Sequence, residues 1–167
     1  SSTNAARVQA SSNVATTKSA VEQSRLAAAS RRSQITQAEA AVKTALAELA
    51  KARAQVAQPE ADTRLAALEF RRREALFTKG DISQQSLDQS RNALQNARSR
   101  LDAAQKAVES ANSRVNEARA GVATANENYR QSLAGVDVSR AQLGESKGRL
   151  QQADTAPQQV DVSESQV

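Results

Sequence analysis

The chain has 167 residues, of which 39% are hydrophobic but only 2% aromatic, with one Tyr, two Phe and no Trp, Met, Cys or His. Large side chains supply most of the area that burial removes from water, so this composition cannot build a thick globular core. The 23 basic and 18 acidic residues are interspersed, so the net charge of +5 is a weak indication of nucleic-acid binding, and we expect no nucleic-acid partner.

The missing residue types exclude much catalytic and metal chemistry. Without His there is no His-based acid–base catalyst and no HExxH zinc site, and without Cys there is no thiol nucleophile or thiolate ligand. The five glycines are scattered rather than gathered in a phosphate-binding loop. We predict no enzymatic activity, no cofactor and no metal site. No stretch approaches the roughly 20 apolar residues of a membrane span.

A seven-residue repeat runs through the first half of the chain, over about residues 5–78. Its larger residues are Val14, Val21, Ala28, Ile35, Val42, Leu49, Val56, Thr63, Phe70 and Phe77. Three positions after them come Thr17, Ser24, Arg31, Ala38, Ala45, Ala52, Pro59, Ala66 and Arg73. Two such rows form the seam of a coiled coil, so we predict one long helical arm here.

Pro59 interrupts this pattern. A proline inside a helix costs about 3 kcal/mol or bends the helix, because it has no N–H and its ring meets the carbonyl four residues back. Both a tolerated kink and a flexure with a function are compatible with the sequence.

Residues 79–83 carry the signals that end one helix and start another. Gly80 can take the left-handed backbone conformation that commonly ends a helix. Ser83 is a good N-cap, and Ile82 with Leu87 would form a hydrophobic staple at the start of the next helix. We therefore place a turn near Gly80, shaped by Gly80 and Ile82.

The same repeat is more regular in the second arm, over about residues 83–155. Its large row is Leu87, Leu94, Leu101, Val108, Val115, Val122, Tyr129, Val136, Leu143 and Leu150. Its small row is Ser90, Ala97, Ala104, Ala111, Ala118, Ala125, Ser132, Ser139, Ser146 and Ala153. Carboxylates such as Glu109 and Glu117 sit among Arg and Lys at helical spacing, as on a solvated face.

Four glycines, at positions 121, 135, 144 and 148, fall within this second helix and each costs about 1 kcal/mol relative to alanine. They indicate either drift on an exposed face or close contact with a neighbouring hairpin.

The two arms are predicted to pair antiparallel, with opposed residue numbers that add up to 160. In this register Leu49 faces Ala111 and Val115 faces Ala45, so a large residue meets a small one. Sums of 153 or 167 would also fit the repeat but would move the turn away from the glycine. The predicted fold class is therefore all-α, a long antiparallel two-helix coiled-coil hairpin. Each helix would have about 73 residues and a length of roughly 110 Å.

Small residues in the seam bury little area per layer, so a lone hairpin should be marginally stable. Pro157 lies beside the N-terminus in this register and is expected to end the paired region. Residues 156–167 would then lead into a lipoyl-like domain that this sequence lacks, since the chain reads as a fragment of a larger protein.

The turn region resembles a known motif. Residues 72–83 read Arg-Arg-Glu-Ala-Leu-Phe-Thr-Lys-Gly-Asp-Ile-Ser, which contains Arg, three residues, Leu, six residues and Ser. This spacing resembles the hairpin-tip motif of periplasmic adaptor proteins, or membrane fusion proteins, of the HlyD and EmrA type. The resemblance implies that Arg72, Leu76 and Ser83 form a docking triplet.

The resemblance also implies a function and a set of partners. The chain would be a periplasmic adaptor subunit of a tripartite efflux pump or type I secretion system, anchored to the inner membrane of a Gram-negative bacterium. Its tip would dock onto a TolC-type outer-membrane channel to form a sealed export conduit. Missing parts of the protein would contact the inner-membrane transporter, and copies would assemble side by side as an oligomer, expected to be a hexamer.

Other interpretations fit parts of the sequence. A structural coiled-coil scaffold without a transport role would share the repeat, although a continuous rod has no need of Gly80, Ile82 and Ser83 together. A protein that becomes helical only on drying would give a coil-like circular dichroism spectrum in dilute buffer. A nucleic-acid binder would show strongly salt-dependent affinity for DNA. At the tip, Leu76 could merely pack the turn and Ser83 merely cap the helix.

Overall fold

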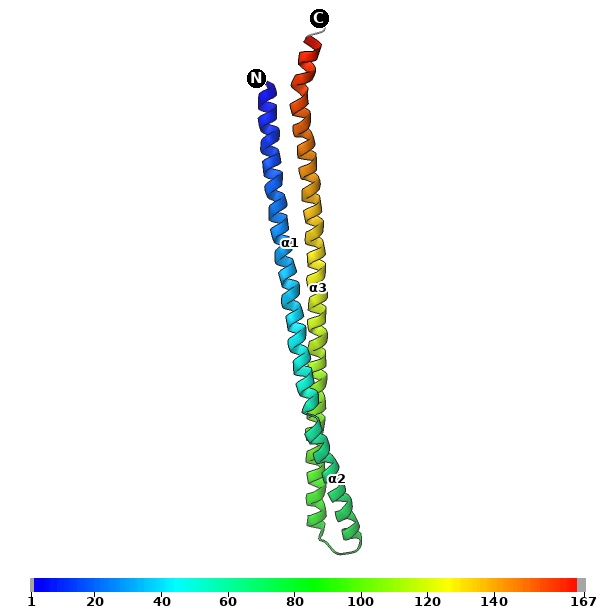
Figure 1. The fold of residues 1–167 in the computed structure, drawn as a ribbon. Coiled ribbons are helices and arrows are strands. Elements are labelled where there is room, and N and C mark those ends of the chain that lie inside the picture. The colour runs from blue at the N-terminus through cyan, green and yellow to red at the C-terminus, as the bar shows by residue number, and fades with distance from the viewer. Residues whose placement is uncertain (1, 165–167) are drawn as a thin grey trace. The chain divides into compact units, whose positions relative to one another are not determined.

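The computed structural model describes residues 2–164 of the chain, and the side chains of residues 4–155. Three helices account for nearly all of it: α1 (Ser2–Ala54), α2 (Ala57–Thr78) and α3 (Gln84–Glu164). No strand occurs between residues 2 and 164. Figure 1 shows α2 beside the beginning of α3, with the turn joining them. The prediction of an all-α helical hairpin that turns near Gly80 is confirmed.

The chain divides into two compact units. One unit combines Ser1–Gln37 with Val122–Val167, and the other comprises Ala38–Gly121. In each unit a segment of the first arm packs against a segment of α3.

The Ala38–Gly121 unit contains a small hydrophobic core. Ala45, Leu49, Ala111 and Val115 form one buried cluster, and Val115 is only 2% exposed. Ala52, Val108 and Ala118 pack around this cluster. The predicted opposites Leu49 with Ala111 and Val115 with Ala45 thus share one core, as the register with the sum of 160 requires.

The other unit has a more polar seam. Val21, Ala28, Ala125 and Val136 are buried in it, but several seam positions carry hydroxyl groups. These groups donate hydrogen bonds to carbonyls of their own helix: Ser24 Oγ lies 2.8 Å from Val21 O, and Ser132 Oγ lies 2.6 Å from Tyr129 O. The hydroxyl groups are thereby satisfied without a partner on the other arm, so the seam can include them.

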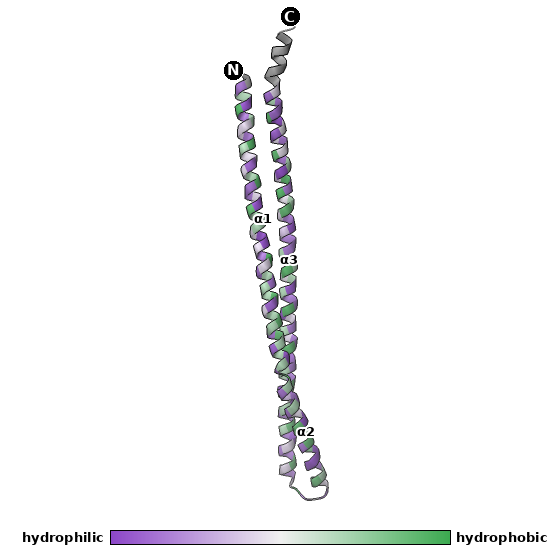
Figure 2. Cartoon of the chain, viewed as in Figure 1, coloured by the Kyte–Doolittle hydropathy of each residue, from purple (hydrophilic) through white to green (hydrophobic). Residues whose placement is uncertain are grey.

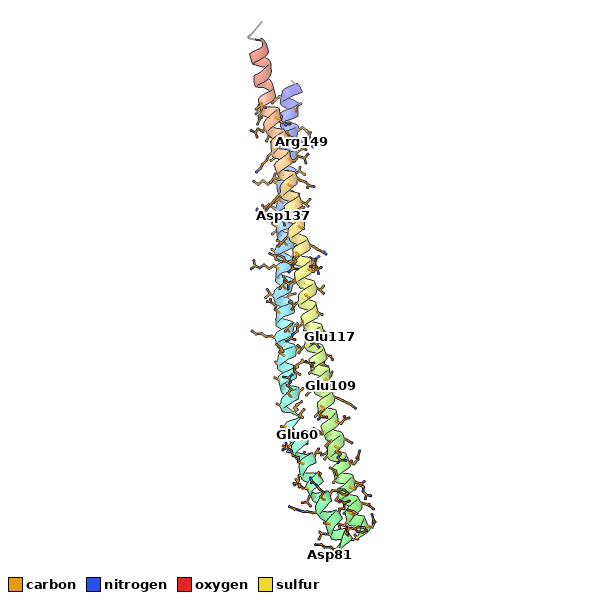
Figure 3. All side chains as sticks on the ribbon, turned by 90° about the vertical axis from the view of Figure 1, so that its right-hand side faces the viewer. Glu60, Asp81, Glu109, Glu117, Asp137 and Arg149 are labelled. Carbon is orange, nitrogen blue, oxygen red and sulfur yellow. The ribbon has the colours of Figure 1, made fainter. Side chains whose placement is uncertain are left out.

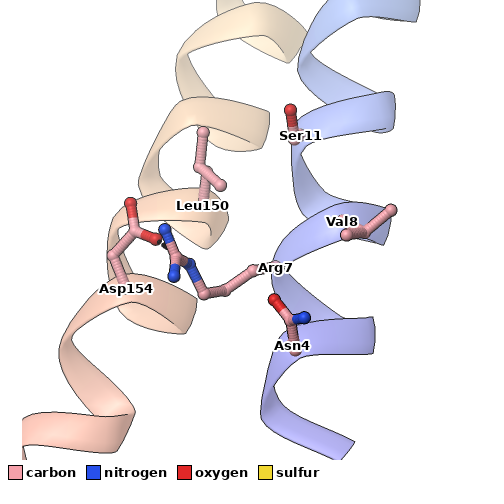
Figure 4. A pocket seen from close by; sticks show the side chains of 6 residues that line it. All are labelled: Asn4, Arg7, Val8, Ser11, Leu150 and Asp154. Carbon is pink, nitrogen blue, oxygen red and sulfur yellow. Dashed lines mark hydrogen bonds and ion pairs between the residues drawn. The ribbon is translucent and has the colours of Figure 1, made fainter. Parts of the chain in front are cut away.

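An ion pair joins the two arms at the outer end of this unit. Arg7 Nε lies 2.7 Å from Asp154 Oδ1, beside a shallow pocket that Leu150 also lines (Figure 4). Both side chains are about half exposed, so the contribution of this pair to stability is small.

The predicted seam of α3 is confirmed along its whole length. Every residue of both rows, from Leu87 to Ala153, is buried or half-buried. The rows of the first arm hold with two exceptions, Arg31 and Phe77, which are exposed. Arg31 keeps its guanidinium in water and donates a hydrogen bond to Gln34 Oε1 at 3.1 Å. Phe77 lies in the last turn of α2, and 38% of its surface is exposed.

The first arm is not one continuous helix, so the expectation of a single helix of about 73 residues is wrong. The helix ends at Ala54, and α2 begins at Ala57 with Val56 at its N-cap position. A continuous helix would direct the Gln55 carbonyl at Pro59, which has no N–H to donate and whose ring would clash there. The chain solves this conflict by a break before the proline. Pro59 then lies in the first turn of α2, where a missing N–H has no consequence.

The second arm extends further than expected, because α3 continues through Pro157 to Glu164. The predicted end of pairing at Pro157 concerns side chains outside those that the structure describes, and residues 165–167 lie outside the described residues altogether. The exit segment 156–167 toward a lipoyl-like domain therefore stays a prediction.

Polar and apolar residues are intermixed along α1, α2 and the coloured part of α3 (Figure 2). Within the described part of the chain, none of the helices combines the length and the apolar character needed to span a membrane. The four glycines within α3 are exposed, and an added Cβ at any of them would meet nothing within 4 Å. The close approach of the two arms does not require these glycines, and contact with a neighbouring hairpin stays a prediction.

Candidate docking site at the hairpin turn

The end of α2 has a regular glycine stop. Gly80 has a φ angle of +81° and is the only residue with positive φ between residues 2 and 164. The Gly80 N–H donates to Phe77 O at 2.9 Å, and the Asp81 N–H donates to Leu76 O at 3.0 Å. This pair of hydrogen bonds is the Schellman motif, which satisfies carbonyls that the helix end would otherwise leave unpaired. The direction of the turn is therefore fixed by backbone bonds.

The start of α3 is capped by Ser83. The Ser86 N–H donates to Ser83 Oγ at 3.2 Å, and the Leu87 N–H donates to Ser83 O at 3.2 Å. The side-chain oxygen of Ser83 thus serves as the N-cap acceptor. Its own O–H remains available as a donor, because the side chain is exposed. Ile82, the other residue predicted to shape the turn, is half-buried.

Two arginines tie α2 to α3 just behind the turn. Arg73, at a seam position, reaches across from α2 and donates to Ser86 Oγ at 2.6 Å. The guanidinium of Arg91 on α3 lies 5.8 Å from the centre of the Phe70 ring on α2, within the range of a cation–π interaction. These contacts join the ends of the two helices in addition to the burial of Leu87 and Leu94.

The predicted docking residues are all on the surface. The Arg72 side chain is 74% exposed, and its Nη1 lies 3.2 Å from Glu69 Oε1 on the same helix. Leu76 is 39% exposed and lies one turn further along the same face of α2, since it follows Arg72 by four residues. Ser83 lies on the far side of the turn, at the start of α3. Arg72 and Leu76 thus share a helix face, and the turn carries Ser83 to the same end of the hairpin.

Sequence reasoning missed three exposed apolar residues in this region. Phe77 was assigned to the seam but is exposed beside Leu76. Leu65 and Leu68 are 61% and 51% exposed on α2. Their positions in the seven-residue repeat could have indicated this exposure, because neither residue belongs to the two seam rows.

The exposed groups at this end are of kinds that bind a partner. Figure 3 shows Asp81 at the turn. The predicted docking residues Arg72, Leu76 and Ser83 offer a guanidinium, an apolar side chain and a hydroxyl group. Among the described side chains, no group of three or more acidic, His or Cys residues could hold a metal ion. The site can donate hydrogen bonds, present positive charge and bury apolar surface against a partner.

A family model described as "RND MFP, alpha-helical hairpin domain", in which MFP stands for membrane fusion protein, matches residues 48–132. The matched segment is just over half of the chain, includes all of α2 and the turn, and reaches from the core cluster on α1 into α3. No curated protein and no solved structure is significantly similar to the chain.

Proposed function

Since the chain belongs to the RND membrane fusion protein family through its alpha-helical hairpin domain, we propose that the hairpin turn docks end-on onto a TolC-type outer-membrane channel. The family consists of non-enzymatic periplasmic adaptors of efflux, which oligomerise and work with an outer-membrane channel and an inner-membrane transporter. In the proposed function the docked turn completes a sealed export conduit.

The observation that carries this proposal is the exposure of Arg72 and Leu76 beside a turn that is fixed by backbone hydrogen bonds. The Schellman hydrogen bonds at Gly80 and the cap at Ser83 already restrict the backbone of the turn. Binding therefore costs little conformational entropy there. Arg72 offers a planar fork of donors for carbonyls or carboxylates of the channel, and its exposed pair with Glu69 is weak enough to exchange. Leu76 offers an apolar side chain that a partner can bury.

Phe77 joins this proposed surface. Its exposure next to Leu76 enlarges the apolar part of the turn, and aromatic side chains are frequent anchors of protein interfaces. Ser83 contributes through its O–H, which capping leaves available.

The finer assignment that we propose is an adaptor of the HlyD or EmrA type, in efflux or type I secretion, anchored to the inner membrane of a Gram-negative bacterium. It is supported by the spacing of Arg72, Leu76 and Ser83 and by helices that continue on both sides of residues 48–132. The scaffold alternative has no comparable support, because it explains neither the family match nor the exposed apolar turn.

Export by the full-length protein in cells tests the docking proposal. Leu76→Asp and Arg72→Asp should each abolish export while the helical circular dichroism signal stays unchanged. Leu26→Asp is a matched control, since Leu26 is 70% exposed and far from the turn in sequence. Arg25→Asp is a second control, because Arg25 pairs with Glu22 at the same spacing as Arg72 with Glu69. Normal export in both tip variants would end the docking proposal.

Crosslinking gives an independent test of contact. The chain has no Cys, so Arg72→Cys and Ser83→Cys introduce single reactive sites. Each should form a crosslink to the outer-membrane channel in cells, whereas Leu26→Cys should not.

A further inference from the structure

A pocket behind the turn is lined by one face of α2 and one face of α3. The lining residues are Ala67, Phe70 and Arg71 on α2, and Arg91, Leu94, Gln95 and Arg98 on α3. Their spacings of three, four and seven residues place each set on one side of its helix. All of them belong to the Ala38–Gly121 unit, and the pocket has a volume of about 460 Å³. This volume is within the range of sites that bind small organic molecules.

The apolar residues of this pocket lie deeper than its charged ones. Leu94 is 7% exposed, and Ala67 and Phe70 are half-buried, whereas Gln95 and all three arginines are exposed. The pocket thus has an apolar floor and a rim of guanidinium groups. One of these groups, that of Arg91, already lies over the Phe70 ring, 5.8 Å from its centre. The floor can cover an apolar body, and the rim can bind an acidic group.

The positive charge of the rim is incompletely neutralised within the chain. No acidic residue lines the pocket. Arg91 pairs with Asp88 of its own helix at 3.2 Å. Arg71 and Arg98, in contrast, take part in no ion pair within the described part of the chain. Asp62, which lies at the level of Arg98 in the register, accepts a hydrogen bond within its own helix instead.

Two other pockets of the chain contain their own counterions. Arg7 and Asp154 line one pocket together and lie 2.7 Å apart. Arg114 and Glu48 line another, at 3.3 Å. In both, a carboxylate of the chain already binds the guanidinium. The pocket behind the turn lacks such a carboxylate, so a carboxylate from a ligand can take the corresponding place.

We propose that this pocket binds an organic anion with a flat aromatic body and a carboxylate. The aromatic body lies on the floor at Phe70 and Ala67, beside the Arg91 guanidinium, because guanidinium groups stack on aromatic faces. The carboxylate accepts hydrogen bonds from the guanidinium groups of the rim, whose planar forks match its two oxygens. Arg71 and Arg98 are the main source of attraction, since neither has an acidic partner.

A bound anion also connects α2 to α3. No residue of α2 is fully buried, so this helix has few contacts that hold it in place. The ligand places a negative charge among arginines that otherwise repel one another, and its body covers apolar area from both helices. Binding therefore stabilises the attachment of α2 to α3. The pocket includes none of the predicted docking residues, so this inference goes beyond the proposed function and does not rest on it.

Calorimetric titration of the full-length protein with naphthoate tests the class of ligand. We expect saturable binding of one naphthoate per chain. Naphthalenemethanol keeps the rings without the charge, and acetate keeps the charge without the rings. Each should bind at least about tenfold more weakly, because each loses one of the two interactions. Absence of saturable naphthoate binding, or equal binding of the neutral alcohol, would overturn the proposal. So would equal binding of octanoate, which has an apolar body that is not aromatic.

A double variant tests the arginines without a ligand-induced assumption about the fold. Arg71→Gln with Arg98→Gln should lower the affinity for naphthoate about tenfold or more while the helical circular dichroism signal stays unchanged. Arg64→Gln with Arg100→Gln is the matched control, since these arginines are exposed on the same two helices but do not line the pocket. Equal losses in the two double variants would contradict the proposal, because the attraction would then come from the general charge of the surface.

Protection of a single thiol tests the location of the ligand. Gln95→Cys places a thiol in the pocket, and Asn92→Cys places one on an exposed neighbour that does not line it. The chain has no other Cys. With naphthoate at ten times its Kd, alkylation of Gln95→Cys should slow about tenfold, because only the free fraction reacts. Alkylation of Asn92→Cys should not change. Equal rates with and without naphthoate in Gln95→Cys would place the ligand elsewhere and overturn the proposal.

The same measurements separate this pocket from docking at the turn. Leu76→Asp should abolish export but leave naphthoate binding unchanged. Absence of naphthoate binding would remove this inference and leave the docking proposal intact, whereas saturable binding with normal export in both tip variants would do the reverse.

Discussion

Two parts of the Ala38–Gly121 unit use the same seven-residue repeat with different results. Around Val115, side chains from α1 and α3 form a closed core, and the exposed residues beside it are alanines, polar or charged residues and one large apolar residue, Leu46. Along α2, no side chain is fully buried, and Leu65, Leu68, Leu76 and Phe77 are exposed. The comparison shows that large apolar side chains in the core cluster are buried and stabilise the fold, whereas most of those on α2 stay exposed and can contact a partner.

The break between α1 and α2 separates these two parts. It follows directly after the core cluster, at Gln55 and Val56, while α3 continues unbroken on the other side. Only the first arm is therefore interrupted, and beyond the break contacts such as the Arg73–Ser86 hydrogen bond add to the burial of Leu87 and Leu94 on α3.

The largest expected effect is in the core cluster. Leu49→Ala should lower the free energy of unfolding by about 3 kcal/mol, since it removes a buried side chain and leaves a cavity. Leu65→Ala removes the same atoms from an exposed site and should change this free energy by less than about 0.5 kcal/mol. Urea unfolding followed by circular dichroism measures both. Equal losses would contradict the difference between the two parts.

Replacing Pro59 tests whether the proline causes the break between α1 and α2. Pro59→Ala permits a hydrogen bond to the Gln55 carbonyl, so α1 and α2 should join into one helix with a gain in stability of about 2 kcal/mol. Helical content and thermal unfolding would report the change, with Gln58→Ala as the neighbouring control. A helix that stays broken in Pro59→Ala would mean that the break has another cause.

The glycine at the turn and a glycine within α3 should respond in opposite directions. Gly80→Ala forces a side chain into positive φ and should lower the stability by about 1.5 kcal/mol. Gly121→Ala should raise it by up to about 1 kcal/mol, because its Cβ meets open space in a regular helix. Thermal unfolding of the two variants compares them directly, and destabilisation by both would refute this interpretation.

The smallest effect concerns Ser83, where capping and docking can be separated. Ser83→Ala should lower the stability by about 1 kcal/mol through loss of the cap, and Ser83→Asp should restore it, since Asp also caps a helix. Asp has no hydroxyl donor, so the proposed docking role predicts reduced export in both variants. Full export with Ser83→Asp would show that Ser83 acts only as a cap.

Much of the fold could be predicted because its signals are local and repeated. The heptad rows of α3 contain every fully buried residue among the described side chains of that helix, and Gly80 with Ser83 located the turn. The register followed from the turn, because the position of the turn and the repeat together leave one way to pair the arms. The candidate docking residues came from a motif, and their role in docking stays a prediction.

The remaining features depend on how each residue meets its surroundings. Pro59 indicated that the helix of the first arm is disturbed nearby. The break itself lies at Gln55 and Val56, because the proline ring clashes with the carbonyl four residues before it and offers that carbonyl no N–H. Phe77 continues the repeat, yet it is exposed at the end of α2.

The sequence by itself determined the two helical arms, the turn and the register of this protein, since periodicity and turn chemistry are properties of neighbouring residues. Only the tertiary structure decided how much each side chain is covered, where the first arm breaks, and which residues of α2 remain exposed. The physical reason is that the burial of a side chain depends on the surface packed against it. The position of a residue in a repeat does not specify that surface.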